Sequence, residues 1–322
     1  MRWVRFSAAA AAPGALPRLG VLCAGGVVDV ERTYARYRAA GGREEAGVAV
    51  ALAAGSLTRW IRCAAGGAFA TWLLNHADVA DLPQEAAHLC APLADPARFV
   101  CVGLNYRAHA REIGQPYPPS PPLFAKWSNS IVGPNDPIVR PRGCCALDYE
   151  GELGVVIGRR VRDISVSEAL DAVFGYTIVD DVSARDWQFR TSQWLAGKVA
   201  DSFAPLGPAV VERRHIPDPQ ALTIRTWVNG ELRQDGATSD MIFGVAALVS
   251  ILSTITTLEA GDLIATGTPG GVGMSAQPPR YLNPGDRVRI EIGGIGSLDN
   301  TVTDAPRGPL RAGHEGDYIQ QE

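Results

Sequence analysis

The chain has 322 residues, 46% of them hydrophobic, and a formal net charge of −4. A chain of this length and apolar content can bury the core of one large domain, or of a large and a small one. Its negative charge, without any run rich in Lys and Arg, argues against nucleic acid or an anionic membrane surface as a partner.

The first part of the chain, residues 1–95, carries short structural patterns but no candidate for chemistry. We expect strands at 2–7, 19–23 and 27–30, and helices at 45–52 and 68–76. Pro92 and Pro96 mark a change in composition. We therefore predict a small variable N-terminal domain of residues 1–95 and a second domain of residues 96–322.

The N-terminal residues and the cysteines indicate the cellular compartment of the protein. The apolar run near the N-terminus is alanine and is interrupted by Pro13 and Pro17, unlike an export signal. No window approaches the roughly 20 apolar residues that a membrane span needs. The six cysteines include no CxxC pair, which favours free thiols in a reducing compartment. We expect a cytoplasmic protein.

The second region consists of many short β-branched runs divided by Gly and Pro. The runs predict strands at 99–102, 152–157, 174–180, 209–211, 223–228, 262–266 and 287–292. Helices are expected at 107–113, 167–172 and 240–253, the last with Asp240 as an acidic N-cap. Strands dominate and do not alternate regularly with helices, which disfavours a doubly wound sheet or a TIM barrel. The predicted class is α+β, mostly β, with peripheral helices.

Three carboxylates stand at the ends of apolar runs. Glu150 and Glu152 are two residues apart, so on a strand they point to one face. The apolar run 153–157 follows them, and like charges near a core need protons or a cation for compensation. Asp181 ends a second apolar run, and three oxygen ligands favour Mg²⁺ or Mn²⁺ over Zn²⁺. The spacing alone also fits a solvated edge strand.

Two further segments carry candidate functional groups. His109 and Glu112 share a face of the helix expected at 107–113, where the carboxylate can hold one imidazole nitrogen and leave the other as a base. An ordinary surface pair is the alternative. The glycines of segment 266–273 let backbone amides and the Thr268 hydroxyl approach a ligand oxygen, although a structural turn explains them too. The segment lacks the pattern of a nucleotide-binding loop.

Six motifs, in this order within residues 99–303, resemble the fumarylacetoacetate hydrolase family. They are VGLNYRAHARE (102–112), DYEGEL (148–153), DVSARDWQ (181–188), GKVADSFAPLGP (197–208), VNGE (228–231) and ATGTPGGVG (265–273). Within the family, the chain looks like the branch of acylpyruvate hydrolases and 2-hydroxyhepta-2,4-diene-1,7-dioate isomerases. The resemblance implies the family's mixed β-sandwich or roll with peripheral helices for the second domain, and a homodimer.

The resemblance also implies roles for individual residues. Glu150, Glu152 and Asp181 match the metal ligands, with Asp180 the less favoured neighbour, and Lys198 matches a lysine beside the metal. His109 and Glu112 match a pair on a mobile lid, in which the glutamate orients the imidazole and the histidine activates a water. The positions that match substrate-contacting residues, or that lie near the pocket, are Gln188, Thr268 and Lys126.

The implied activity is divalent-metal-dependent hydrolysis of a C–C bond in a small 2,4-diketo acid. Mg²⁺ or Mn²⁺ is the expected cofactor, with Ca²⁺ as a further candidate. The same enolate chemistry serves a decarboxylase, or a tautomerase or isomerase, of oxaloacetate-like or 2-hydroxy-dienoate acids. A catalytically silent relative that only binds metal is the remaining alternative.

Overall fold

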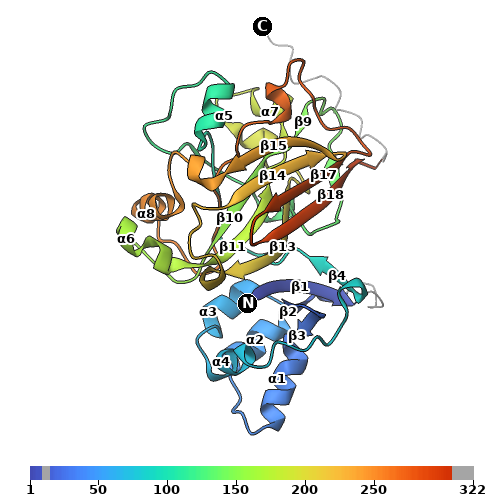
Figure 1. Ribbon diagram of the computed structural model, residues 1–322, viewed down its shortest axis with the longest axis vertical. Helices are drawn as coiled ribbons and strands as arrows, with labels where there is room; N and C mark the ends of the chain where they lie inside the picture. Colours follow the sequence, from blue (N-terminus) through green and yellow to red (C-terminus); the bar gives the residue numbers. More distant parts are fainter. Residues whose placement is uncertain (9–14, 307–322) are drawn as a thin grey trace, which may run out of the picture.

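The computed structural model describes residues 1–8 and 15–306, and strands predominate over helices in it (Figure 1). The predicted class, a mixed fold with mostly strands and peripheral helices, is confirmed. The strands form three open sheets. The final residues of the predicted second domain, 307–322, and the alanine run at 9–14 lie outside the described part of the chain.

The largest sheet has eleven strands, ordered β3-β2-β1-β13-β11-β10-β16-β5-β6, with β4 also paired to β1 and β7 to β13. Its strands are β1 (Arg2–Ala8), β2 (Arg18–Cys23), β3 (Gly26–Asp29), β4 (Ala87–Cys90), β5 (Phe99–Val102), β6 (Leu123–Ala125), β7 (Ile131–Val132), β10 (Gly151–Ile157), β11 (Val173–Asp180), β13 (Ala204–Glu212) and β16 (Leu263–Ala265).

A five-stranded sheet, ordered β15-β14-β17-β18-β8, packs over the middle of the large sheet. Its strands are β8 (Ile138–Arg140), β14 (Thr223–Val228), β15 (Glu231–Ala237), β17 (Arg287–Ile292) and β18 (Gly296–Asp304). In β14 and β17 the more exposed positions alternate with buried ones, so one face of each strand covers the core. The third sheet pairs β9 (Leu147–Asp148) with β12 (Ser183–Ala184).

Strand β10 is buried at every position, because both of its faces are covered. Leu153, Val155 and Ile157 belong to the core shared with the five-stranded sheet. Val156 belongs to a second core that includes Trp3 and residues of the N-terminal helices. This burial explains the continuous apolar run after Glu152, and it places the carboxylates at the entrance to the core.

Helices lie at the periphery, as Figure 1 shows. They are α1 (Val30–Ala39), α2 (Ala46–Ala53), α3 (Leu57–Cys63), α4 (Ala68–Leu74), α5 (Arg107–Glu112), α6 (Val166–Ala169), α7 (Arg185–Gln188) and α8 (Val245–Ile255). The expected start of the last helix at Asp240 is wrong, because Gly244 is the N-cap of α8. The Asp240 carboxylate instead accepts the backbone N–H of Ala108, so it caps the neighbouring helix α5.

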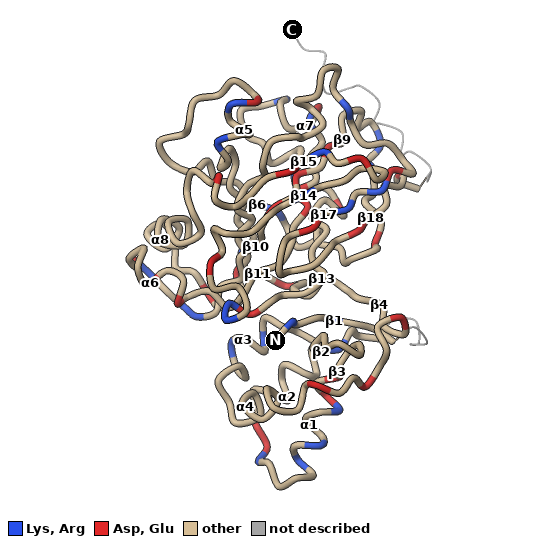
Figure 2. The backbone as a smooth tube through the Cα atoms, viewed as in Figure 1, with Lys and Arg blue, Asp and Glu red and all other residues tan. Residues whose placement is uncertain are grey.

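The N-terminal region is joined to the rest of the chain by backbone pairing. Strand β1 pairs antiparallel with β13, and helices α1 to α4 pack below it in the view of Figure 1. The division into residues 1–95 and 96–322 stays a prediction. Acidic and basic residues are interspersed along the tube of Figure 2. None of the described helices is long and apolar enough to cross a membrane.

Candidate metal centre and active-site cavity

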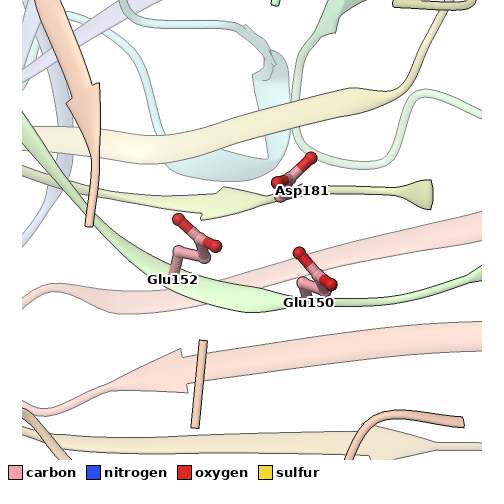
Figure 3. A group of neighbouring side chains, drawn as sticks. All are labelled: Glu150, Glu152 and Asp181. Atoms are coloured by element: carbon pink, nitrogen blue, oxygen red, sulfur yellow. The ribbon is translucent and has the colours of Figure 1, made fainter. Parts of the chain in front are cut away.

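The three predicted carboxylates meet at one end of the β10–β11 pair (Figure 3). Glu150 directly precedes β10, Glu152 lies in it, and Asp181 directly follows β11. Because Gly151 pairs with Asp180 across the two antiparallel strands, the three side chains converge. One carboxylate oxygen from each lies within 4.8 Å of the others, and all three residues are buried.

Three cations compensate two of these carboxylates. The Lys198 ammonium lies 2.9 Å from both Glu150 Oε2 and Asp181 Oδ2. Arg185 Nη2 lies 2.7 Å from Glu150 Oε1, and Lys126 Nζ lies 2.8 Å from Asp181 Oδ1. Burial disfavours the charged form of Glu150, but the charges of Lys198 and Arg185 outweigh it and hold its pKa below the usual range.

Glu152 lacks such compensation within the described structure. Within the described residues, the one hydrogen bond to its carboxylate comes from the backbone N–H of Gly267, at 2.9 Å from Oε2. Burial, and then the charges of Asp181 and Glu150, raise the pKa of Glu152 well above its ordinary value. A buried carboxylate among other carboxylates fits a cation as its partner, and an all-oxygen donor set suits Mg²⁺ or Mn²⁺. Glu150, Glu152 and Asp181 would hold that ion.

Asp180 lies beside this group but is not part of it. Its Oδ1 accepts the backbone N–H of Glu150 at 2.9 Å, so the carboxylate supports the chain that carries a candidate ligand. Burial raises the pKa of Asp180 to about 7.

His109 and Glu112 lie on one face of α5, as expected. His109 Nδ1 is 3.4 Å from Glu112 Oε2, and the backbone N–H of Gly271 donates to both oxygens of Glu112, at 2.9 and 3.1 Å. Partial burial opposes ionisation of Glu112, but the hydrogen bonds from His109 and Gly271 outweigh it and lower its pKa. The glycine-rich segment thus anchors the carboxylate that holds the imidazole.

A cavity of about 330 Å³ brings most of the predicted residues together. Its polar lining residues are His109, Gln115, Glu150, Glu152, Arg185, Gln188, Lys198 and Thr268, and apolar side chains complete it. Glu112 and Asp181 are not lining residues, but Glu112 contacts His109 and Asp181 contacts Lys198. The Thr268 hydroxyl donates to the carbonyl of Gly151 and accepts from Gln234, so its proton is already used within the protein.

Lys126 is not among the residues that line the cavity, in contrast to the expected substrate contact. Its side chain is fully buried, and besides Asp181 the ammonium contacts three backbone carbonyls. It donates to the oxygens of Val182, Lys198 and Phe203 at 3.1, 2.7 and 2.6 Å. Because these partners use all of its protons, Lys126 ties together the segments that carry Asp181 and Lys198.

Sequence reasoning gave no role to Arg185 and Asp148, although both lie in the quoted motifs. Arg185 Nε donates to Asp148 Oδ2 at 2.9 Å, and Nη1 donates to Gln188 Oε1 at 3.0 Å. Asp148 also accepts the backbone N–H groups of Gly273 and Met274. The signal that could have found them is their place in these motifs, because Asp148 stands two residues before Glu150 and Arg185 four residues after Asp181.

Comparisons with known proteins agree with this geometry. The family model of the fumarylacetoacetate hydrolase C-terminal domain matches residues 98–303. A mitochondrial oxaloacetate tautomerase of Xenopus laevis is 46% identical over 223 residues, which cover 69% of this chain and 70% of that protein.

Solved structures extend the likeness to the N-terminal region. A fumarylacetoacetate hydrolase from Exiguobacterium antarcticum is 37% identical with a TM-score of 0.73, and a maleylpyruvate hydrolase from Sphingobium sp. SYK-6 is 28% identical with a TM-score of 0.74. Each match covers 95% of this chain and 100% of the other, and the second structure contains manganese(II) and pyruvate. The chain belongs to the fumarylacetoacetate hydrolase family.

Proposed function

We propose that the protein is a divalent-metal-dependent hydrolase that cleaves a C–C bond in a small 2,4-diketo acid. The proposal rests on one observation: the imidazole of His109, backed by Glu112, faces the same cavity as Glu150, Glu152 and Lys198. Support also comes from relatives that are hydrolases, one of which was solved with manganese(II) and pyruvate.

The residues of the chain divide the chemistry between them. Glu112 favours the tautomer of His109 that carries its proton on Nδ1, which leaves Nε2 to take a proton from water. The hydroxide attacks the C4 carbonyl, the C3–C4 bond breaks, and the pyruvate enolate that leaves takes a proton at C3. A divalent ion at the three carboxylates supplies Lewis-acid charge for the developing enolate. The products are a carboxylate and pyruvate.

The test is turnover of acetylpyruvate, followed by loss of its enol absorbance and by release of pyruvate in equal amount. We expect turnover with Mg²⁺ or Mn²⁺, loss of turnover after chelation, and recovery when the ion is restored; Ca²⁺ is a third ion to try. Absence of pyruvate release from a panel of acylpyruvates would contradict the hydrolase proposal. A metal-induced rise in melting temperature without turnover of any keto acid would favour the silent alternative.

Tautomerisation of oxaloacetate is the second candidate, and the Xenopus laevis relative favours it. In this reaction a base moves the C3 proton and no water attacks. Enol-oxaloacetate would then convert to the keto form without release of CO₂, whereas a decarboxylase would release CO₂ and pyruvate.

Substitution His109→Ala separates the candidates, because only hydrolysis requires the activated water. We expect it to lower the rate of acetylpyruvate hydrolysis by about 10²–10⁴-fold and to affect tautomerisation and decarboxylation far less. His88→Ala, a change at a half-exposed histidine of β4, is the matched control. Equal losses in all three reactions would count against the role of His109 in water activation. A homodimer and a cytoplasmic location also stay predictions.

A further inference from the structure

The cavity has a buried, charged floor and a more exposed, apolar mouth. Glu150, Glu152 and Lys198 at the floor are at most 7% exposed, whereas Phe189 at the mouth is 57% exposed. The apolar side chains that line the cavity include Leu104, Ile113, Phe124, Phe189, Trp194 and Met274. A substrate whose keto-acid end lies at the floor therefore directs its other end along an apolar wall.

This wall is built by specific packing. The rings of Phe124 and Trp194 meet edge to face with centroids 5.8 Å apart. A Cβ on Gly103 would lie 2.4 Å from the ring of Trp194, so the absence of a side chain at this position allows the indole to lie against the cavity. Such rigid aromatic walls are typical of sites that accept apolar groups.

The cations that line the cavity are already paired within the described structure. Lys198 is held by Glu150 and Asp181, and Arg185 by Asp148, Glu150 and Gln188. His109 contacts the Glu112 carboxylate through Nδ1. A second carboxylate at the far end of a substrate would find no unpaired positive side chain among the lining residues.

Two arginines belong to segments that carry lining residues but are not lining residues themselves, and both have other partners. Arg111, on α5, donates to the Tyr117 hydroxyl at 3.0 Å. Arg190, after α7, donates to the carbonyl of Asp186 and lies over the ring of Trp187. Arg111 lies on the helix that carries His109. It is therefore the arginine whose contact with a distal substrate carboxylate has to be tested by experiment.

We infer that the substrate is a 2,4-diketo monocarboxylate with a neutral, apolar acyl group, selected over dicarboxylates of the same length. The inference rests on the proposed function, because it assumes that the keto-acid end lies at the carboxylate floor. A carboxylate moved from water to an apolar wall loses hydration, and the lining offers it no unpaired cation in exchange, only neutral amides such as that of Gln115. A methyl group at the same position instead buries apolar surface.

The test compares butyrylpyruvate with succinylpyruvate, which differ only in a terminal methyl or carboxylate, on the Mn²⁺-loaded protein. We expect kcat/KM to be at least about tenfold higher for butyrylpyruvate, the size of effect that such pockets give. Substitution Phe189→Arg places a cation at the exposed mouth and should lower this ratio at least about tenfold, whereas Phe189→Leu should preserve it. Equal or reversed preference in the unmodified protein would overturn the inference.

Two arms keep this test separate from the proposed function. If neither these two compounds nor any other acylpyruvate of the panel is cleaved, the hydrolase proposal fails. The two dissociation constants then decide the inference: butyrylpyruvate must bind at least about tenfold more tightly. Substitution Arg111→Ala should leave the preference unchanged. A selective loss of succinylpyruvate binding in this variant would show that Arg111 reads a distal carboxylate, which would also overturn the inference.

Discussion

At the scale of single residues, the candidate centre is a balance of buried charges. The sequence predicted the three carboxylates and the His109–Glu112 pair because they stand in motifs that resemble those of the family, whereas their spacing alone also fitted a solvated strand and a surface pair. The environment of Lys126 could not be predicted, since its partners include backbone carbonyls from separate segments. Hydrogen bonds to carbonyl groups leave no pattern in side-chain identity, so a buried lysine and a solvated one look the same in the sequence.

Replacing Lys126 should therefore damage the fold more than substrate recognition. Lys126→Met leaves Asp181 without one cation and removes one donor from each of three carbonyls, which we expect to lower the free energy of unfolding by about 3–5 kcal/mol. Chemical denaturation measures this loss. Arg160→Met, which removes an exposed ion pair with Glu259, should cost less than about 1 kcal/mol. A Lys126 variant of unchanged stability would show that its contacts contribute little.

Glu112 should act as a positioning residue for His109. In Glu112→Gln the amide still reaches the backbone N–H of Gly271, but the negative charge beside the imidazole is lost. Because an anion stabilises the positive charge that the imidazole gains when it takes a proton from water, its removal should lower kcat and leave KM little changed. Glu112 itself, with a lowered pKa, stays ionised at neutral pH. An unchanged kcat would argue that the carboxylate has only a structural role.

At the scale of elements, apolar and β-branched runs predicted the central strands, whereas strands with largely polar sequences were not predicted. The prediction for 223–228 matches β14, and that for 287–292 matches β17. Strands β15 and β18 were not predicted, because their sequences are largely polar and they are ordered by pairing with β14 and β17. Asp240 shows a related limit, since a cap residue recognised in the sequence serves another helix.

The glycine-rich segment connects element geometry to the site. Gly271 has a φ of +100°, and a Cβ there would lie 2.0 Å from the carbonyl oxygen of Arg233. Gly271→Ala should therefore displace the amide that holds Glu112, costing about 1–3 kcal/mol of stability and lowering kcat. The neighbouring Gly270 is a matched control, because a Cβ there meets Glu112 only at 3.5 Å. Melting temperature and kcat of the two alanine variants test this, and equal behaviour would refute it.

At the scale of the whole molecule, long-range pairing joins the N-terminal region to the strands that carry the site. Composition suggested a boundary near residue 95, but no local pattern shows that β1 pairs with β13. Trp3 lies in β1, contacts Trp60 with ring centroids 4.8 Å apart, and donates to Glu212 at 2.7 Å. The same core contains Val179 of β11, two residues before Asp181.

This continuity predicts that the chain unfolds as one cooperative unit. Trp3→Ala removes a fully buried indole and should lower the stability by about 3–5 kcal/mol. If the two regions form one unit, thermal loss of activity and loss of fluorescence shift together to lower temperature. Trp227→Ala, on the five-stranded sheet, removes a half-buried ring and should cost less. If Trp3→Ala instead produced an early unfolding transition that left activity intact, the N-terminal region would unfold independently of the rest. The predicted boundary near residue 95 would then separate two folding units.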